Sequence, residues 1–358
     1  MRSNKFIGRD WIDAEIDFSR EEWDSLINVA LELKRMYAMN IDHSHLLRGK
    51  TLFTMFFNQS LRTRSTFAAG IQQLGGYHVD LEPGKTYTPA RKGFEIPYKT
   101  ERICDVAQVL SRVGDAIAIR AYGEVGHWIY GFANAIMKEF AQYADIPVIN
   151  MECDKYHPTQ ALADMITLKE KYGDLKGRKF VMSWAYSGST HKPYAVPQSL
   201  VLAPTLMGMD VVFARPKGFE LDPEVIKKCH QFAKVNGGSF EEMDDMDAAF
   251  EKADVVYPKC WGSGDYFAKV DKTGKIVKKE DLDGMKVLFD KNKSWICTSK
   301  KMKLCKPNAY YMHCLPADRD MEVTDEVIDG PQSIVFDEAE NRLHAHKAIM
   351  AMIMGGRM

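Results

Sequence analysis

The sequence predicts an α/β protein made of two doubly wound domains, each built on a parallel sheet. The chain has 358 residues, which is too long for one ordinary hydrophobic core and favours two domains of about 150 to 200 residues each. Short apolar, β-prone runs alternate with longer helical patterns along the chain. This alternation is typical of parallel strands that are joined by crossover helices.

The individual elements follow from hydrophobic periodicity and from glycine and proline positions. The apolar run 51–57 precedes a helical pattern over 60–74, which Gly75 can end in a left-handed conformation. The other strand-like runs are 115–120, 147–151, 179–184, 210–214, 254–257, 309–313 and 333–337. The other helical patterns are 101–113, 127–143, 159–172, 222–235 and 338–354.

A domain boundary is expected just after the run 147–151, where His157 and Pro158 interrupt the pattern. We therefore expect a first domain over 1–155 and a second over 156–337, with a C-terminal helix over 338–358 that could pack on either. Ligands of open α/β sheets bind beyond the carboxyl ends of the strands. The expected active site is accordingly a cleft between the two domains.

Composition excludes several functional classes. With 48 Lys+Arg against 49 Asp+Glu, the chain lacks the global basic field that nucleic-acid-binding proteins usually show. It has no apolar run of the roughly 18 residues that span a membrane and no signal-peptide core, so we expect a cytoplasmic protein without a membrane partner. The 7 cysteines are odd in number and irregularly spaced, which predicts reduced thiols.

The segment Phe57-Asn58-Gln59-Ser60-Leu61-Arg62-Thr63-Arg64 lies between a predicted strand and a predicted helix. The N–H groups of a first helical turn and the positive end of the helix dipole attract an anion. Ser60 and Thr63 add hydroxyls, and Arg62 can form two parallel bonds, which suits a phosphate dianion. Arg64 cannot face the same way as Arg62 and is expected to serve structure. The alternative is a Ser-capped surface helix with solvated arginines.

The segment His157-Pro158-Thr159-Gln160 places proline at a helix start, where its missing N–H costs nothing. A neutral His157 ring could donate to a carbonyl oxygen while the Gln160 amide contacts an adjacent NH2 group, a combination that fits a carbamoyl group. Arg120 closes the run 115–120, and strand ends of this kind carry ligand contacts. The alternative for His157 is a structural residue at a helix end.

Together with His313-Cys314-Leu315-Pro316, and in this order, the two segments resemble the active site of the aspartate/ornithine carbamoyltransferase family. The resemblance covers the chain from about residue 5 onward. It implies an enzyme that moves the carbamoyl group of carbamoyl phosphate to the amine of an ornithine-type amino acid of arginine metabolism. It further implies no metal or organic cofactor, a final helix that returns to the first domain, and a homotrimer in which the loop 85–96 completes the neighbour's site.

The resemblance also assigns roles. It implies that the phosphate is held by Ser60, Leu61 through its backbone, Arg62, Thr63 and Arg342. Thr63, Arg120 and His157 would polarise the carbonyl, Gln160 and the Leu315 backbone would contact the carbamoyl nitrogen, and Cys314 would face the junction of the two substrates. The implied catalytic set is Thr63, Arg120, His157 and Cys314, and the implied acceptor-binding set is Glu152, Lys259, Trp261 and Leu315.

The acceptor side departs from ordinary ornithine carbamoyltransferases, in which an Asp after a strand binds the α-ammonium and a Ser-Met-Gly loop follows. Here Lys259 stands where that Asp is expected, which disfavours free ornithine. The pattern resembles the branch that uses N-acetylornithine or N-succinylornithine, as do Phe56-Phe57-Asn58 and residues 337–344. That branch has a knotted loop, whose counterpart would be 184–197. The tryptophan of acetylornithine enzymes is missing near 85–88, however, and Glu322 replaces a lysine that some of them have.

Several alternatives remain open. Lys259 could be a solvated lysine at a strand end, and Trp261 could be a core or lid residue. The chain could be an ordinary ornithine carbamoyltransferase, or a carbamoyl-phosphate-binding protein without productive turnover. A dinucleotide-dependent oxidoreductase is a poorer candidate, because no Gly-x-Gly-x-x-Gly joins a strand to a helix. His344 and His346 lie two residues apart on a predicted helix and so do not form a metal pair.

Overall fold

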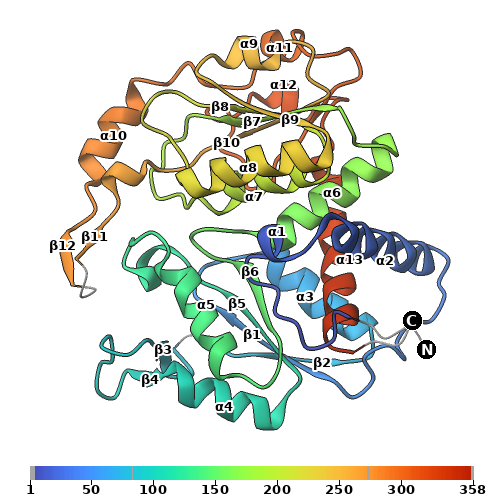
Figure 1. The fold of residues 1–358 in the computed structure, drawn as a ribbon, viewed down its shortest axis with the longest axis vertical. Helices are drawn as coiled ribbons and strands as arrows, with labels where there is room; N and C mark the ends of the chain where they lie inside the picture. The colour runs from blue at the N-terminus through green and yellow to red at the C-terminus, as the bar shows by residue number, and fades with distance from the viewer. Residues whose placement is uncertain (1–4, 83, 272–274, 356–358) are drawn as a thin grey trace. The chain divides into compact units, whose positions relative to one another are not determined.

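The computed structural model describes residues 5–82, 84–271 and 275–355, and these residues form two compact units (Figure 1). Unit 1 contains the residues up to Gly126, Gly131–Ile166 and those from Asn341 onward. Unit 2 contains His127–Tyr130 and Thr167–Glu340. Each unit has a parallel sheet with helices around it, which confirms the predicted fold class. The domain ranges 1–155 and 156–337 stay predictions, and residues 356–358 of the predicted last helix lie outside the described residues.

Unit 1 is built on a four-stranded parallel sheet in the order β2-β1-β5-β6. Helices α4 and α5 cover one face of this sheet, and α3 packs against the other (Figure 1). The strands are β1 Thr51–Phe56, β2 Tyr77–Asp80, β5 Ala116–Arg120 and β6 Val148–Glu152, with a small pair β3 Thr88–Ala90 and β4 Thr100–Arg102. The helices are α1 Ala14–Asp17, α2 Arg20–Ala38, α3 Arg62–Gln73, α4 Ile103–Val113, η1 Gly123–Gly126 and α5 Phe132–Tyr143.

Unit 2 is built on a five-stranded parallel sheet in the order β13-β10-β7-β8-β9. Its strands are β7 Lys179–Trp184, β8 Asp210–Ala214, β9 Ser239–Met243, β10 Val255–Lys259 and β13 Tyr310–Tyr311, with a small antiparallel pair β11 Lys269–Val270 and β12 Ile276–Lys278. Its helices are α7 Ala195–Leu206, α8 Pro223–Asn236, α9 Met246–Phe250, η2 Gly264–Tyr266, α10 Leu282–Asp290, α11 Ser299–Met302 and α12 Asp325–Ile328. Two further helices, α6 Pro158–Tyr172 and α13 Val335–Ile353, each have one end in each unit.

Local sequence signals explain where several helices begin and end. Helix α8 starts with Pro223 after the capping residue Asp222, whose side chain accepts from the Glu224 N–H, and it ends at Gly237 in a left-handed conformation. Helix α3 ends before Gly75, whose φ is +85°. A Cβ at Gly75 would lie 1.8 Å from the Ser44 carbonyl oxygen, so the glycine is required there both for its backbone angle and for space.

The structure corrects some predicted elements. The run 333–337 is not a strand, because α13 begins at Val335 and only an isolated bridge joins Ser333 to Tyr311. Asp337 and Glu338 favour a first helical turn through the helix dipole, a signal that the apolar Ile334 and Val335 obscured. The helix predicted over 127–143 begins only at Phe132, after a short 3-10 turn. The short edge strands β2 and β9 were missed, since pairing with a neighbour rather than an apolar pattern defines them.

Two other expectations concern cysteines and the loop after β7. All seven cysteines are free thiols, which confirms the prediction of reduced cysteines. Residues 185–194 join β7 to α7 without regular structure, and the knot predicted for 184–197 stays a prediction. Among the described helices, none combines the length and the apolar character that crossing a membrane would require.

Candidate active site

The N-terminus of α3 forms the first part of the candidate site. Leu61 precedes the helix and is 75% exposed, and no side chain caps this end. The Ser-capped alternative is therefore not what the structure contains. Arg62 is half-buried and Thr63 is buried at the start of the helix. Arg64 pairs with Asp80 and lies over the Phe56 ring, which confirms its expected structural role.

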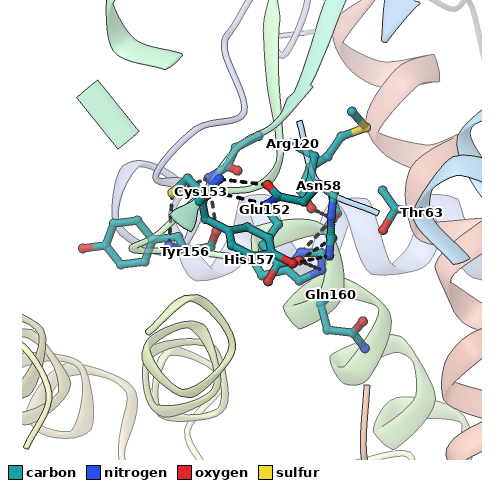
Figure 2. A network of polar contacts seen from close by, with 12 residues as sticks. Asn58, Thr63, Arg120, Glu152, Cys153, Tyr156, His157 and Gln160 are labelled. Carbon is teal, nitrogen blue, oxygen red and sulfur yellow. Dashed lines mark hydrogen bonds and ion pairs between the residues drawn. The ribbon is translucent and has the colours of Figure 1, made fainter. Parts of the chain in front are cut away.

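The carboxyl ends of β5 and β6 bring three predicted residues together (Figure 2). Arg120 and Glu152 are opposite each other in the parallel register, and they form an ion pair. The Nε2 atom of His157 lies 3.4 Å from a Glu152 carboxylate oxygen. Glu152 was expected to bind the acceptor, whereas its contacts here are with Arg120 and His157.

His157 has a position and a charge state that suit a hydrogen-bond donor. It directly precedes Pro158, the first residue of α6, as predicted. Its ring is buried, and Nδ1 lies 3.2 Å from the Thr159 hydroxyl. Burial lowers the pKa of His157 well below its usual 6.5, and the nearby charges of Arg342 and Arg120 lower it further. The imidazole is therefore neutral at physiological pH.

Helix α13 contributes Arg342, whose side chain is only 2% exposed. Its Nη2 atom donates to the Thr63 hydroxyl at 2.6 Å, and Nη1 donates to the Gln160 side-chain oxygen. The Gln160 NH2 group donates to Asp164 at 2.8 Å. The oxygen that could accept from a carbamoyl NH2 group thus already receives a bond from Arg342.

We call these unit 1 residues the arginine cluster. Arg62, at the start of α3, adds a third arginine to the two of the cluster. The carboxylates of Glu152 and the neighbouring Asp164 offset two of these positive charges, so the formal charge of the whole group is positive. Buried positive charge beside a helix N-terminus favours a doubly charged anion. The members of the arginine cluster are Thr63, Arg120, Glu152, His157, Gln160 and Arg342.

Unit 2 contains a second group of buried charges, the lysine cluster of Lys259, His313 and Glu322. Lys259 ends β10, is 8% exposed and lies 3.2 Å from a Glu322 oxygen. Glu322 is fully buried and also accepts backbone bonds from Cys260 at 2.7 Å and Asp318 at 2.8 Å. Its second oxygen lies 3.3 Å from His313 Nε2. The alternative of a solvated Lys259 is therefore not supported.

The electrostatics of this pair keep both partners charged. Burial alone would lower the pKa of Lys259, yet the Glu322 charge raises it above the usual value. Burial alone would raise the pKa of Glu322. The Lys259 charge and the interaction with His313 instead lower this pKa well below its usual range. Lys259 and Glu322 thus form an ionised pair with no net charge.

The remaining predicted residues of unit 2 differ in burial, and therefore in their access to a ligand. Cys314 and Leu315 are half-buried. Leu315 has φ +54°, and its N–H donates to His313 Nδ1 at 2.9 Å. A leucine in the left-handed region costs about 1 to 2 kcal/mol, and such strain often marks functional backbone. Trp261 is fully buried, and its indole N–H donates to the Phe219 carbonyl at 3.0 Å. Trp261 is therefore a packing residue here, and we do not place it in an acceptor site.

Two polar residues beside the arginine cluster, Asn58 and His346, were given no role in the site from the sequence. Asn58 exchanges hydrogen bonds with the Tyr122 backbone at 3.0 and 3.2 Å, which joins the chain after β1 to the chain after β5. In the sequence, the position of Asn58 just after a predicted strand was the signal that could have indicated a role in the site. His346 contacts Arg342 from the next turn of α13, and only its spacing of four residues could have indicated this. Within the part of the chain that the structure describes, no group of three or more His, Cys, Asp or Glu residues could hold a metal.

Comparison with known proteins agrees with this geometry. Residues 9–170 match the aspartate/ornithine carbamoyltransferase carbamoyl-P binding domain, and residues 184–353 match the Asp/Orn binding domain of the same family. The fold and both matches define an enzyme of the carbamoyltransferase class. The chain belongs to the aspartate/ornithine carbamoyltransferase family.

Its relatives include enzymes with two different acceptors. The chain is 41% identical to the ornithine carbamoyltransferase of Thermococcus kodakarensis over 98% of this chain and 97% of that protein. It is 39% identical to the N-acetylornithine carbamoyltransferase of Xanthomonas campestris over 95% and 96%. A crystal structure of acetylornithine transcarbamylase complexed with acetylcitrulline is similar, with a TM-score of 0.86 and 36% identity over 97% of this chain and 99% of that one.

Proposed function

We propose that this enzyme transfers the carbamoyl group of carbamoyl phosphate to the terminal amine of an N-acylated ornithine or a similar derivative, and releases phosphate. The observation that carries the proposal is the arginine cluster at the strand ends and helix start of unit 1. A family match to a carbamoyl-P binding domain covers all of these residues except Arg342, which falls in the match to the Asp/Orn binding domain. We further propose the domain ranges 1–155 and 156–337 for the two substrate-binding domains.

The chemistry requires orientation and charge stabilisation rather than covalent catalysis. In the proposed reaction the acceptor amine attacks the carbamoyl carbon, and the C–O bond to phosphate breaks. Neutral His157, Thr63 and Arg120 would donate to the carbonyl oxygen as negative charge develops there. Arg62, Arg342, Ser60 and the backbone of Leu61 would hold the phosphate, which leaves as an anion and can accept the proton released by the amine.

We propose that unit 2 supplies the remaining contacts to the carbamoyl group and to the acceptor. The backbone carbonyl of Leu315 would accept from the carbamoyl nitrogen, and Cys314 would face the reacting amine. The Lys259 ammonium donates one N–H to Glu322 and could donate another to an acceptor carboxylate. Both oxygens of Glu322 already have partners, and Asp318 lies 3.2 Å from Lys192. This leaves the lysine cluster without a carboxylate to neutralise an α-ammonium group, and supports an acceptor whose α-nitrogen is uncharged.

A second candidate acceptor is free ornithine. The specific observation in its favour is the 41% identity to the Thermococcus kodakarensis ornithine carbamoyltransferase. In that case, a group outside the lysine cluster would have to bind the α-ammonium. The two candidates share the arginine cluster and differ only in what unit 2 recognises.

The test is a comparison of acceptors. Purified protein would be incubated with carbamoyl phosphate and, separately, ornithine, N-acetylornithine and N-succinylornithine, with phosphate release and carbamoylated product both measured. We expect at least one N-acylated acceptor to exceed ornithine by about tenfold in kcat/KM, which corresponds to about 1.4 kcal/mol. A higher kcat/KM for ornithine than for every N-acylated acceptor would refute the acceptor assignment. Binding of carbamoyl phosphate without turnover of a wide acceptor panel would favour the binding-protein alternative.

A further inference from the structure

A histidine that the proposed chemistry does not use lies directly behind the arginine cluster. His346 is on α13, four residues after Arg342, and its side chain is fully buried. Its ring stacks on Phe67 with the ring centroids 4.0 Å apart. Nδ1 lies 3.0 Å from the Thr66 hydroxyl, and Nε2 lies 3.5 Å from Arg342 Nε. Both ring nitrogens of His346 therefore face polar partners in unit 1.

These contacts determine which ring nitrogen carries the proton. Arginine has only donors, so Nε2 of His346 must accept from Arg342, and the ring proton must be on Nδ1. Nδ1–H then donates to the Thr66 oxygen, and the Thr66 hydroxyl hydrogen points to the Arg62 carbonyl at 2.6 Å. Burial lowers the pKa of His346 well below 6.5, and the Arg342 charge lowers it further, so the ring stays neutral.

The result is one continuous chain of hydrogen bonds. It runs from Arg342 through His346 and Thr66 to the backbone of Arg62, the first residue of α3. The other end of the Arg342 guanidinium contacts Gln160 and Thr63. The Arg342 guanidinium is thereby held at Nε and at both Nη atoms. The first residue of α3, Arg62, belongs to the same series of hydrogen bonds through its carbonyl.

We propose that His346 is a positioning residue for carbamoyl phosphate binding, which holds Arg342 and the first turn of α3 in place through its Nε2 and Nδ1 atoms. The inference rests on the proposed function, because it assigns His346 to the site that would bind carbamoyl phosphate. An arginine side chain has about 2 kcal/mol of rotamer entropy to lose. Fixing it before the ligand arrives removes part of that cost from binding.

The chain offers a matched control on the same helix. His344 is also fully buried, and neither of its ring nitrogens has a hydrogen-bond partner among the described residues. His344→Leu and His346→Leu therefore make the same chemical change two residues apart. His346→Gln is the conservative variant, because its amide can accept from Arg342 and donate to Thr66. Thr66→Val, at a half-buried position, removes the hydroxyl that links His346 Nδ1 to the Arg62 carbonyl.

The measurement is the KM of each substrate together with calorimetric binding of inorganic phosphate. We expect His346→Leu to raise the KM of carbamoyl phosphate and the Kd of phosphate by about tenfold, since Arg342 Nε loses its buried acceptor. The acceptor KM should change less than about twofold, because the acceptor does not use Arg342. His346→Gln should recover most of the loss, and His344→Leu should keep the wild-type values.

The outcomes separate this inference from the proposed function. Equal effects of His344→Leu and His346→Leu would overturn it, as would a His346→Gln variant no better than His346→Leu. If His346→Leu does not fold, Thr66→Val should still weaken phosphate binding selectively, and wild-type binding by that variant would refute the inference. A wild-type protein that turns over another substrate but binds neither carbamoyl phosphate nor phosphate would refute the proposed function itself.

Discussion

Replacing Lys259 by methionine tests the buried ion pair of unit 2 most directly. Lys259→Met keeps an apolar stem of similar length and leaves the Glu322 carboxylate without its cation. Glu322 is fully buried, and the groups that still act on it are two backbone N–H groups, His313 and the more distant charge of Lys192. Removing one partner of a buried pair costs about 3 to 5 kcal/mol. We therefore expect a loss of that order in the free energy of unfolding at neutral pH.

The loss should depend on pH. In the wild type the pKa of folded Glu322 lies below the ordinary 4.5, so its contribution to stability is present above 4.5 and is lost only as pH falls through the lower, folded value. Lys259→Met removes the largest charge that opposes burial, so we expect burial to outweigh the remaining effects of His313 and Lys192 and to raise this pKa above 4.5. The folded variant then takes up a proton, on Glu322 or on His313, before the unfolded chain does. The destabilisation should shrink by up to about 1.4 kcal/mol per pH unit as the pH is lowered.

Urea unfolding followed by fluorescence between about pH 5 and pH 7.5 measures both effects. The Lys259→Met, Glu322→Gln double variant is the control, because it removes both charges and should recover much of the lost stability. A loss below about 1 kcal/mol that does not vary with pH would refute the reasoning, since an exposed pair would behave in that way. A double variant no more stable than Lys259→Met would also contradict it.

Three further predictions concern the arginine cluster and the assembly. Arg62→Ala should weaken carbamoyl phosphate binding and lose most turnover, because the anion loses a bidentate partner; unchanged steady-state kinetics would remove the assignment. His157→Ala should lower kcat more than carbamoyl phosphate affinity, because a polariser acts as charge develops; equal losses in kcat and in calorimetric affinity would count against that role. Light scattering should give a closed homotrimer, with the loop 85–96 at the neighbour's site; a stable, fully active monomer would contradict it.

The structure also changes how the acceptor preference can be tested by mutation. From the sequence alone, Lys259→Asp should narrow the gap between N-acylated and free ornithine by supplying an anion. With Glu322 adjacent to Lys259, that variant would place two carboxylates in one buried site, where one of them would be protonated. The Lys259→Asp, Glu322→Lys double variant keeps the pair neutral while moving the anion to position 259. This exchange should lower the ratio of kcat/KM for N-acylated ornithine to kcat/KM for free ornithine. An unchanged ratio would exclude a role for position 259 in acceptor preference.

Much of the fold could be predicted from local sequence, because local signals determine it. The strands β7 and β8 have the predicted bounds, and α6 begins at Pro158 directly after His157. Buried parallel strands are continuous apolar runs, and proline or glycine defines the adjoining helix ends. The prediction failed over 333–337, where buried residues of a helix start were taken for a strand.

The sequence by itself determined the order of the elements, the strand ends that carry Arg120 and Lys259, and the family that the three motifs resemble. Periodicity and capping act over a few residues, so they can be recognised without coordinates. Only the tertiary structure decided which charges meet. Lys259 and Glu322 are 63 residues apart in the chain, and Arg342 and Thr63 are 279 apart. Whether a charge is paired or free depends on burial and on partners brought together by packing, and no local pattern encodes either.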